Sequence, residues 1–531
     1  MNGKIMKKRV QNHWLRWMLP AIVFGAFTGV LTAAVVIAYK LCAKQVIYLS
    51  EQGYQFLRGH LYWIPLVLIG FFGLGCLLAH LYRRIPNLRG GGIPASIGVL
   101  RGIIPMKWLR NVVGVFFLSL SSFLIGVPLG NEGPSVQIGT ALGRGSVASF
   151  GKRYRGWDRY SMTGGACAGF SVATGAPISG ILFAIEEAHE RISPIILIVA
   201  STSVVFAELT NQLLSPLLGV STALFPSLEL RVLSVRELWL PLLVGVAMGV
   251  FSILFLRYYH ILNRWIRRTV KKIPHSLTIA LVFCATLLVG LFSVSFVSSG
   301  HHLILSLFDE SPSLWFLLLI LAVRTTLTIA ANSNGITGGM FLPLLALGAT
   351  LTSLLNGVLQ LGFGLGEEYT SVILVLGIVA CISGMMKQPL TAVVFAVEAL
   401  SGYANILPVI NVSAVSFVLT EIFSAHSIND SVLETRIDMM NEGREQVEID
   451  TSVRVQAGSF AIGKQIRDVF WPNGLHVLTL RHVDVDHPHG KAEGGREMRE
   501  GDLLHVHCQT YDRAHTMEEL CAIVGEQETE K

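Results

Sequence analysis

Two glycine-rich motifs far apart in the chain, Gly130-Asn131-Glu132-Gly133-Pro134 and Gly338-Gly339-Met340-Phe341-Leu342-Pro343, interrupt otherwise apolar sequence. A third motif, Gly90-Gly91-Gly92-Ile93-Pro94, precedes them. In each motif glycines stand before a proline that suits the first turn of a helix. A helix start exposes backbone N–H groups without partners and the positive end of the helix dipole. One such motif is an ordinary helix break, but three of them predict an anion site without a fixed cation.

The composition around these motifs is that of a membrane protein. Hydrophobic residues make up 52% of the 531 residues and charged residues 14%, whereas soluble domains carry about 25% charged residues. This excludes a soluble enzyme, a disordered scaffold and a fibrous protein. Broken helices are tolerated at membrane depth only where they are buried in protein or line a cavity. Apolar segments of near-spanning length fall at about 18–39, 62–82, 112–129, 193–216, 237–259, 276–298, 312–331, 341–361, 370–384 and 405–424.

Charge divides the chain into two parts. Residues 431–531 contain 11 Lys/Arg against 19 Asp/Glu, a net charge of −8, whereas the first 430 residues contain 30 against 16, a net charge of +14. We predict an all-helical membrane domain over residues 1–435 and a soluble domain over residues 436–531. The basic stretches at 4–16 and 257–272 contain no acid, which places them, and both chain ends, on the cytoplasmic side.

The membrane part repeats itself. The segment Pro177–Glu186 resembles Pro389–Glu398 at an offset of 212 residues, and the motif at 130–134 aligns with that at 339–343 at an offset of 209. Near-equal offsets at separate motifs indicate duplicated halves. Repeats with helices interrupted by glycine and proline are typical of transporters whose site lies at the bilayer midplane.

Three glutamates stand at informative places in these repeats. Glu132 lies inside a helix-start motif, where its carboxylate is a tethered anion that leaves the site when protonated. Glu186 and Glu187 end the helix that Pro177 begins, and Glu398 is the repeat partner of Glu186. Only one of Glu186 and Glu187 need be a proton site, and we interpret Glu398 as structural. The alternative for Glu187 is an i,i+4 ion pair with Arg191 on a solvated helix end.

With these motifs in this order, residues 15–435 resemble the CLC family of chloride channels and anion/proton exchangers. The family's GSGIP, GREGP and GxFxP motifs correspond to residues 90–94, 130–134 and 339–343. The resemblance implies an inverted repeat of broken helices, a homodimer and an anion path in each subunit. It implies that Glu132 is the external gate and Glu187 the internal proton relay of an exchanger. The anion-binding positions that it implies are Gly91, Gly92, Ile93, Pro94, Asn131, Gly133, Met340, Phe341 and Asn429.

Three of these positions depart from the family pattern. Gly91 stands where chloride-selective members carry a serine hydroxyl, and Asn131 replaces the arginine of GREGP. Asn429 falls near the place of the family's coordinating tyrosine. Changes at the first two positions also occur in the family's fluoride-exporting branch. A proton-coupled exchanger, with chloride as the favoured anion, is therefore our first prediction, and a fluoride/proton antiporter or a passive chloride channel is the alternative.

The soluble tail resembles the TrkA C-terminal (RCK_C) ligand-sensing domain. We expect strands at 453–456, 475–481 and about 503–507, and helices at 461–470 and 510–524. The resemblance implies a small cytosolic ligand or dimer contacts. Five histidines suggest a metal, but without the spacing of a known site we interpret them as exposed side chains that share no ligand. They are His482, His487, His489, His505 and His507.

The remaining expectations are mostly exclusions. The seven cysteines show no metal spacing and predict no disulfide framework. No enzyme activity, cofactor, metal or nucleic acid is expected. The histidines at segment edges form no catalytic set. The expected partners are a small anion, protons, membrane lipid and a second copy of the chain, in the cell membrane.

Overall fold

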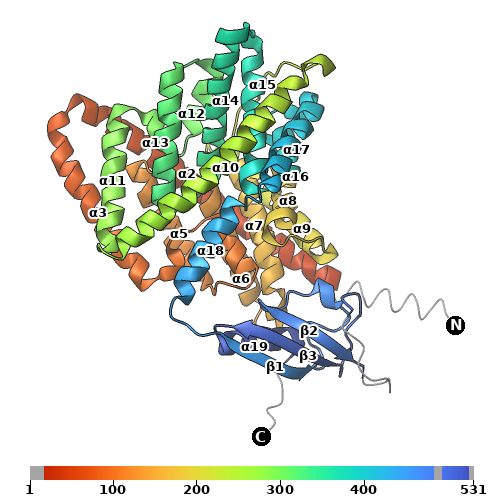
Figure 1. Ribbon diagram of the computed structural model, residues 1–531. Coiled ribbons are helices and arrows are strands. Elements are labelled where there is room, and N and C mark those ends of the chain that lie inside the picture. The colour runs from red at the N-terminus through yellow and green to blue at the C-terminus, as the bar shows by residue number, and fades with distance from the viewer. Residues whose placement is uncertain (1–16, 483–492, 526–531) are drawn as a thin grey trace.

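A computed structural model describes residues 17–482 and 493–525 of the chain (Figure 1). A large bundle of helices lies above a small sheet domain. Within the described residues, ten helices are long and apolar enough to cross a membrane. The helices of the first half are α2 Leu19–Gly59, α3 Ile64–Arg84, α4 Ile93–Leu100, α5 Trp108–Ile125, α6 Glu132–Ala148, α7 Asp158–Thr174, α8 Pro177–Phe183 and α9 Pro194–Leu217. Those of the second half are α10 Trp239–Val270, α11 His275–Phe292, α12 His301–Asp309, α13 Leu314–Ser333, α14 Phe341–Phe363, α15 Thr370–Met386, α16 Pro389–Ala399, α17 Ile406–Ile422 and α18 Ile428–Asn441.

The first helix is longer than the apolar pattern predicts. The apolar segment ends near residue 39, but α2 continues to Gly59. Lys40 remains inside the helix because its Nζ donates to the carbonyl oxygen of Val172, a residue of α7, at 2.7 Å. A polar residue in an apolar span can thus mark a contact within the protein instead of the end of the helix.

Three helices of the bundle are short. Helices α4, α8 and α16 are too short to span a bilayer of about 30 Å, and each begins at a proline in its first turn. The longer helices α6, α7 and α15 are almost wholly buried, and so is the first half of α14. The starts of α6 and α14 therefore lie inside protein, where broken helices are tolerated at membrane depth.

The tail contains a three-stranded antiparallel sheet of order β1-β3-β2, covered by the helix α19. The elements are β1 Val447–Arg454, β2 Leu475–Arg481, β3 Leu503–Thr510 and α19 Arg513–Val524. Alternate residues of the central strand are buried, as one covered face requires. The predicted division at residue 435 falls within α18, so the helix that ends the membrane part extends toward the sheet.

The predicted helix at 461–470 is wrong. The structure has only the short 3-10 turn Ile466–Asp468 in this segment. Gly463 adopts a φ of +76°, which a helix does not accept. The segment's backbone pairs instead with the chain before β3, since Gly463 N–H donates to Met498 O at 2.8 Å and Met498 N–H to Lys464 O at 2.9 Å. These tertiary hydrogen bonds replace those of a helix.

This irregular segment docks the tail onto the membrane part. The ring of Phe470 lies 4.5 Å from that of Tyr160 on α7, and Tyr160 Oη donates to Asp468 O at 2.5 Å. Arg159 donates to Trp471 O at 2.6 Å. Because the contacts are aromatic and buried as well as polar, the tail packs on the end of α7 as part of one core.

Candidate functional site

The three glycine motifs converge. A Cβ on Gly133 would lie 2.6 Å from Gly339 Cα and 3.1 Å from Gly92 Cα. Only glycine fits at such a separation, because each backbone occupies the space of the other's side chain. The starts of α4, α6 and α14, which are far apart in sequence, therefore meet at one point.

Two of these helix starts are joined by backbone hydrogen bonds. Gly130 N–H donates to Gly339 O at 2.7 Å, and Gly339 N–H donates to Gly130 O at 2.8 Å. The first bonds inside the helices begin later, at Ser135 N–H to Asn131 O and at Leu344 N–H to Met340 O. The N–H groups of the intervening first-turn residues have no partner within their helices, and they present a positive dipole end to the junction.

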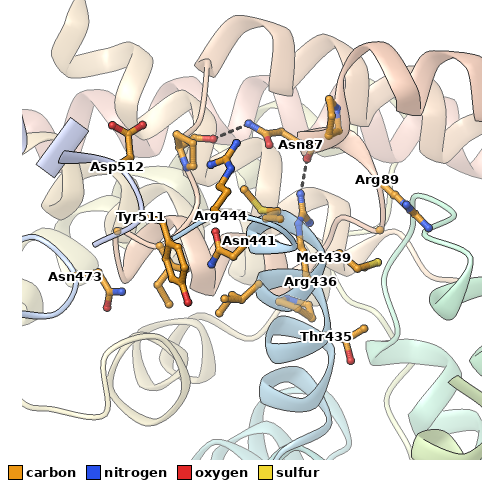
Figure 2. Close-up of a pocket in the computed structure, with 18 of the residues that line it drawn as sticks. Asn87, Arg89, Thr435, Arg436, Met439, Asn441, Arg444, Asn473, Tyr511 and Asp512 are labelled. Carbon is orange, nitrogen blue, oxygen red and sulfur yellow. Dashed lines mark hydrogen bonds between the residues drawn. The ribbon is translucent and has the colours of Figure 1, made fainter. Parts of the chain in front are cut away.

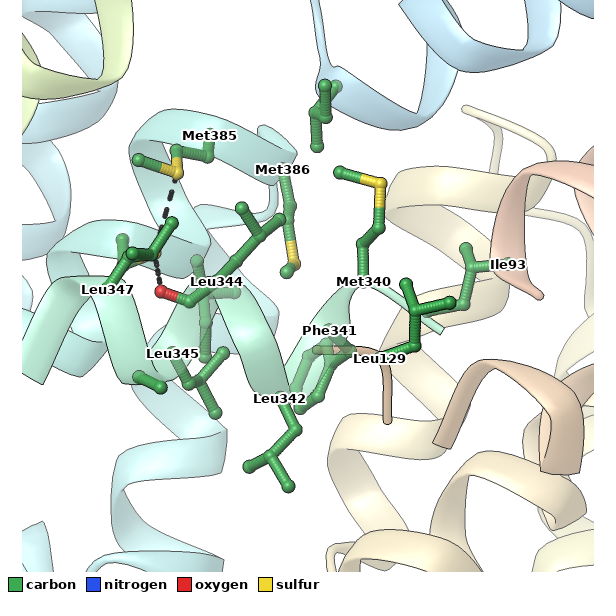
Figure 3. Close-up of a cluster of buried hydrophobic side chains, with 14 of the residues drawn as sticks. Ile93, Leu129, Met340, Phe341, Leu342, Leu344, Leu345, Leu347, Met385 and Met386 are labelled. Carbon is green, nitrogen blue, oxygen red and sulfur yellow. Dashed lines mark hydrogen bonds between the residues drawn. The ribbon is translucent and has the colours of Figure 1, made fainter. Parts of the chain in front are cut away.

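Several of the side chains at the junction are apolar. Figure 3 shows Met340 and Phe341 beside Ile93 and Leu129, which come from different segments of the first half. Phe341 is 2% exposed and its ring meets the Phe170 ring edge-on. An anion held here would contact backbone amides in a buried place, and electrostatic interactions are strengthened in the protein interior.

Glu132 is the first residue of α6 and is completely buried. Among the described residues, neither of its carboxylate oxygens has a hydrogen-bond partner. Its Oε2 occupies the space that a Cβ on Gly130 would fill, next to Leu342. Burial of a charged carboxylate without a partner is costly. The geometry thus supports a group that can change its charge and its position.

Asn131 immediately precedes this glutamate and is the N-cap residue of α6. Its side chain makes no capping hydrogen bond. Its carbonyl oxygen accepts from Ser135, from both the backbone N–H and Oγ. The residue therefore contributes to the helix start through its backbone, and a side-chain role in anion binding stays a prediction.

Gln137 lies beside Gly91, the position at which the family pattern has a serine. Gln137 is 2% exposed, and its Oε1 accepts from Gly92 N–H at 2.7 Å. A Cβ on Gly91 would lie 2.8 Å from the same Oε1. The Nε2 amide makes no hydrogen bond with any described residue. A carboxamide therefore lies beside the position where the family pattern has a hydroxyl, and sequence reasoning missed it because 45 residues separate the two positions.

Glu187 lies in a polar cage. It is 5% exposed, in a π-helical turn that continues α8. Gln388 Nε2 donates to its Oε2 at 2.6 Å, and Asn429 Nδ2 donates to its Oε1 at 3.0 Å. Ser427 Oγ lies 3.4 Å from Oε1. The structure therefore places Asn429 against the carboxylate of Glu187.

The alternative ion pair of Glu187 with Arg191 does not form. Arg191 instead lies over the Phe470 ring, with its guanidinium carbon 4.5 Å from the ring centroid. Arg101 holds the backbone of Glu187 by donating to its carbonyl oxygen at 2.9 Å. The Glu187 carboxylate is thus directed into the protein, toward α16 and α18.

The two repeat-related glutamates cap each other's helices. Glu398 accepts from Ile178 N–H at 2.7 Å and from the N–H and Oγ of Ser179 at 2.9 and 2.8 Å. Glu186 accepts from Leu390 N–H at 2.8 Å and from the N–H and Oγ1 of Thr391 at 2.7 and 2.6 Å. Glu398 is structural, as expected, and Glu186 has the same role in the other repeat. The equal spacing in the sequence was the available signal for this pairing.

Metal-binding geometry is not found among the described residues, since no group of three His, Cys, Asp or Glu side chains could hold an ion. His482 bonds to Asp502 at 2.9 Å, and His505 lies 3.0 Å from Asp450. His487 and His489 lie outside the described residues.

Comparison with known proteins gives consistent relatives. The family model described as voltage gated chloride channel matches residues 74–421, well over half of the chain. The chain is 28% identical to the H(+)/Cl(-) exchange transporter ClcA of Salmonella arizonae over 448 residues, 81% of this chain and 91% of the relative. It is 29% identical to ClcA of Salmonella typhimurium over 431 residues, 78% of this chain and 88% of the relative.

Two solved structures share the fold. The first is a slow cyanobacterial Cl−/H+ antiporter, with a TM-score of 0.71, 24% identity, and coverage of 79% of this chain and 99% of that one. The second is a CLC-type fluoride/proton antiporter, with a TM-score of 0.63, 21% identity, and coverage of 76% and 96%. These relatives are transporters and not enzymes. Taken with the converging helix starts and the buried glutamates, the match means that this chain is an integral membrane protein of the CLC, or voltage gated chloride channel, family.

Proposed function

We propose that the protein exchanges chloride for protons, with Glu132 as the external gate and Glu187 as the internal proton relay. One observation carries the proposal: the two buried carboxylates lie at separate places, one at the convergence of three helix starts and one in the cage formed by Gln388, Ser427 and Asn429. Ionisable groups within a membrane domain are costly and therefore functional by default. A passive channel would not need the second carboxylate.

The anion would bind the helix-start amides of Phe341 and its neighbours. The backbone around Gly92, Ile93, Pro94, Gly133 and Met340 shapes the place. Protonation of Glu132 removes the tethered negative charge, so that an anion can take its position. Deprotonation returns the carboxylate and closes the path. Each cycle thereby moves a proton opposite to the anion.

The test is paired chloride and proton flux from the purified protein in liposomes. Chloride efflux that drives proton uptake is the expected result. In Glu132→Gln, proton movement should disappear while chloride flux continues, and in Glu187→Gln proton flux should fall more than chloride flux. Glu310→Gln, an exposed glutamate at the end of α12, is the matched control. Proton movement that persists in Glu132→Gln would refute the gate assignment.

Fluoride is the second candidate anion because Gly91 offers no hydroxyl and Gln137 occupies the space beside it. The same liposomes with fluoride as the sole permeant anion separate the two candidates. Coupled fluoride flux with little chloride flux would place the protein in the fluoride branch of the family.

We further propose that the protein is a homodimer in the cell membrane, with both chain ends in the cytoplasm. The basic end of α10 supports this orientation, since Lys271 pairs with Glu442 at 3.1 Å on the side where the tail lies. For the tail we propose a role like that of TrkA C-terminal domains, in which a small ligand regulates transport. Cross-linking in native membranes tests the homodimer. Protease access to the tail in inverted vesicles tests the cytoplasmic location of the tail.

A further inference from the structure

A cavity of about 650 Å³ lies between the membrane part and the tail (Figure 2). On the membrane side it is lined by the loop before α4, including Gly90 and Gly91, and by the last turns of α18. On the tail side it is lined by the loops at Asn473 and at Tyr511-Asp512. The cavity therefore reaches the first glycine motif from the side of the membrane on which the tail lies.

Three arginines line this cavity and retain unused donors. Arg436, on α18, donates one hydrogen bond to Asn87 O at 2.7 Å. Arg89 approaches His275 Nε2 at 3.1 Å with one nitrogen, but its Nε is buried without a partner among the described residues. The Arg444 side chain makes no hydrogen bond or ion pair with any described residue. The guanidinium group has five donors and always carries its charge, so these groups offer binding capacity for an anion.

The acids in the same cavity are already engaged within the tail. Asp512 Oδ1 accepts from His515 N–H at 3.0 Å and caps α19. Glu519 Oε1 lies 3.5 Å from His515 Nε2. Neither carboxylate is paired with an arginine of the cavity, and the arginines outnumber the two acids. The field near Arg444 and Arg89 thus favours a negatively charged guest.

We propose that this interdomain cavity is an anion-collecting site, of which the tail forms one wall. It takes a small inorganic anion and delivers it to the glycine motif at Gly91, so that the tail is part of the transport path and not only a regulator beside it. The inference rests on the proposed anion transport. The same donors would accept the transported halide or a cytosolic phosphate, and the two arms of the test distinguish these sources.

The first arm is Arg444→Gln. Chloride flux is measured in inverted membrane vesicles, where the tail faces the outer solution, as a function of outer chloride. The half-saturating chloride concentration should rise about threefold, the order expected when one unit charge is removed near a surface site in physiological salt. Arg481→Gln on β2 removes the same charge from an exposed position outside the cavity, and it should change nothing. Equal behaviour of the two variants would overturn the proposal.

The second arm adds inorganic phosphate to the outer solution. If phosphate inhibits the unsubstituted protein and inhibits Arg444→Gln less, the site also holds anions that are not transported. A raised half-saturating chloride concentration without phosphate inhibition identifies the transported anion as the guest. If the unsubstituted protein moves no chloride coupled to protons, the proposed function fails, whereas normal coupled flux with identical chloride dependence in Arg444→Gln refutes this inference alone.

A cysteine at Asn473 gives a test that does not depend on an arginine. Asn473 is an exposed tail residue that lines the cavity. Asn473→Cys is treated with a negatively charged and a positively charged methanethiosulfonate, with the unsubstituted protein and Arg481→Cys as controls. The negative reagent should lower chloride flux at least twofold more than the positive one. No difference between the reagents would contradict an electrostatic role for this wall.

Discussion

Removing the carboxylate of Glu186 and, separately, that of Glu398 tests how the repeat positions Glu187, the proposed internal proton relay. Each carboxylate accepts three hydrogen bonds from the start of the other repeat's helix, α16 for Glu186 and α8 for Glu398. Only α16 begins directly after Gln388, the residue that donates to Glu187 at 2.6 Å. The two substitutions to alanine should thus remove the same number of hydrogen bonds. Only the substitution at Glu186 acts on the helix that begins after the partner of Glu187.

The expected loss of stability follows from the hydrogen bonds. A net value of about 1 kcal/mol for each of three bonds gives about 3 kcal/mol for either variant. The loss is of this size because two backbone N–H groups at each helix start are left without an acceptor. For a membrane domain of this size, that corresponds to a fall in the thermal midpoint on the order of 5 °C.

The assay combines thermal unfolding of the purified protein with paired flux in liposomes. Both alanine variants should show similar falls in the thermal midpoint. Glu186→Ala should also lower the ratio of proton to chloride flux, because Gln388 is no longer held against Glu187. Glu398→Ala should lower both fluxes in proportion. A coupling ratio that is unchanged in Glu186→Ala, or lowered equally in both variants, would refute the positioning argument.

Two further predictions concern other parts of the chain. Gly91→Ser alone should destabilise the protein, because its Cβ would lie 2.8 Å from Gln137 Oε1 at a φ of +69°. Adding Gln137→Ala should recover the steric part of this loss, as measured by a double-mutant cycle of thermal midpoints and of chloride-to-fluoride flux ratios. Additive losses would contradict the contact. Burial against Phe460 and Trp157 lowers the pKa of Lys464 from 10.5 to about 7. The unfolded tail then binds more protons than the folded one between pH 7 and about 10.5, so tail stability should rise with pH across this window. Lys464→Met should flatten that rise in unfolding measured at pH 7, 8 and 9, and an equal pH dependence in both proteins would exclude Lys464 as its cause.

Much of the fold could be predicted because it depends on local pattern. The apolar segments, the strands β2 and β3 and the last helix follow from composition and alternation within short windows. The predicted helix at 461–470 failed because Gly463 adopts a positive φ and the backbone of this segment pairs with the chain before β3, a tertiary relation that no short window contains. Likewise, α2 continues beyond residue 39 because Lys40 finds a carbonyl partner on α7.

The candidate site divides in the same way. Glu132 and Glu187 stood out in sequence because charges within apolar repeats are costly. Gln137, Gln388 and Ser427 did not, since buried amides and hydroxyls in a membrane protein have no distinctive spacing. Their importance comes only from the partners that they meet.

The amino-acid sequence by itself determined the membrane class, the duplicated halves, the three helix starts and the two buried glutamates, because hydrophobicity, glycine and proline act on the nearest few residues. Only the tertiary structure decided that Gln137 occupies the space beside Gly91, that Asn429 bonds to Glu187 and that Arg444 lines the cavity between the membrane part and the tail. These relations join residues up to several hundred positions apart, and which polar groups pair across such distances is set by how the whole core packs.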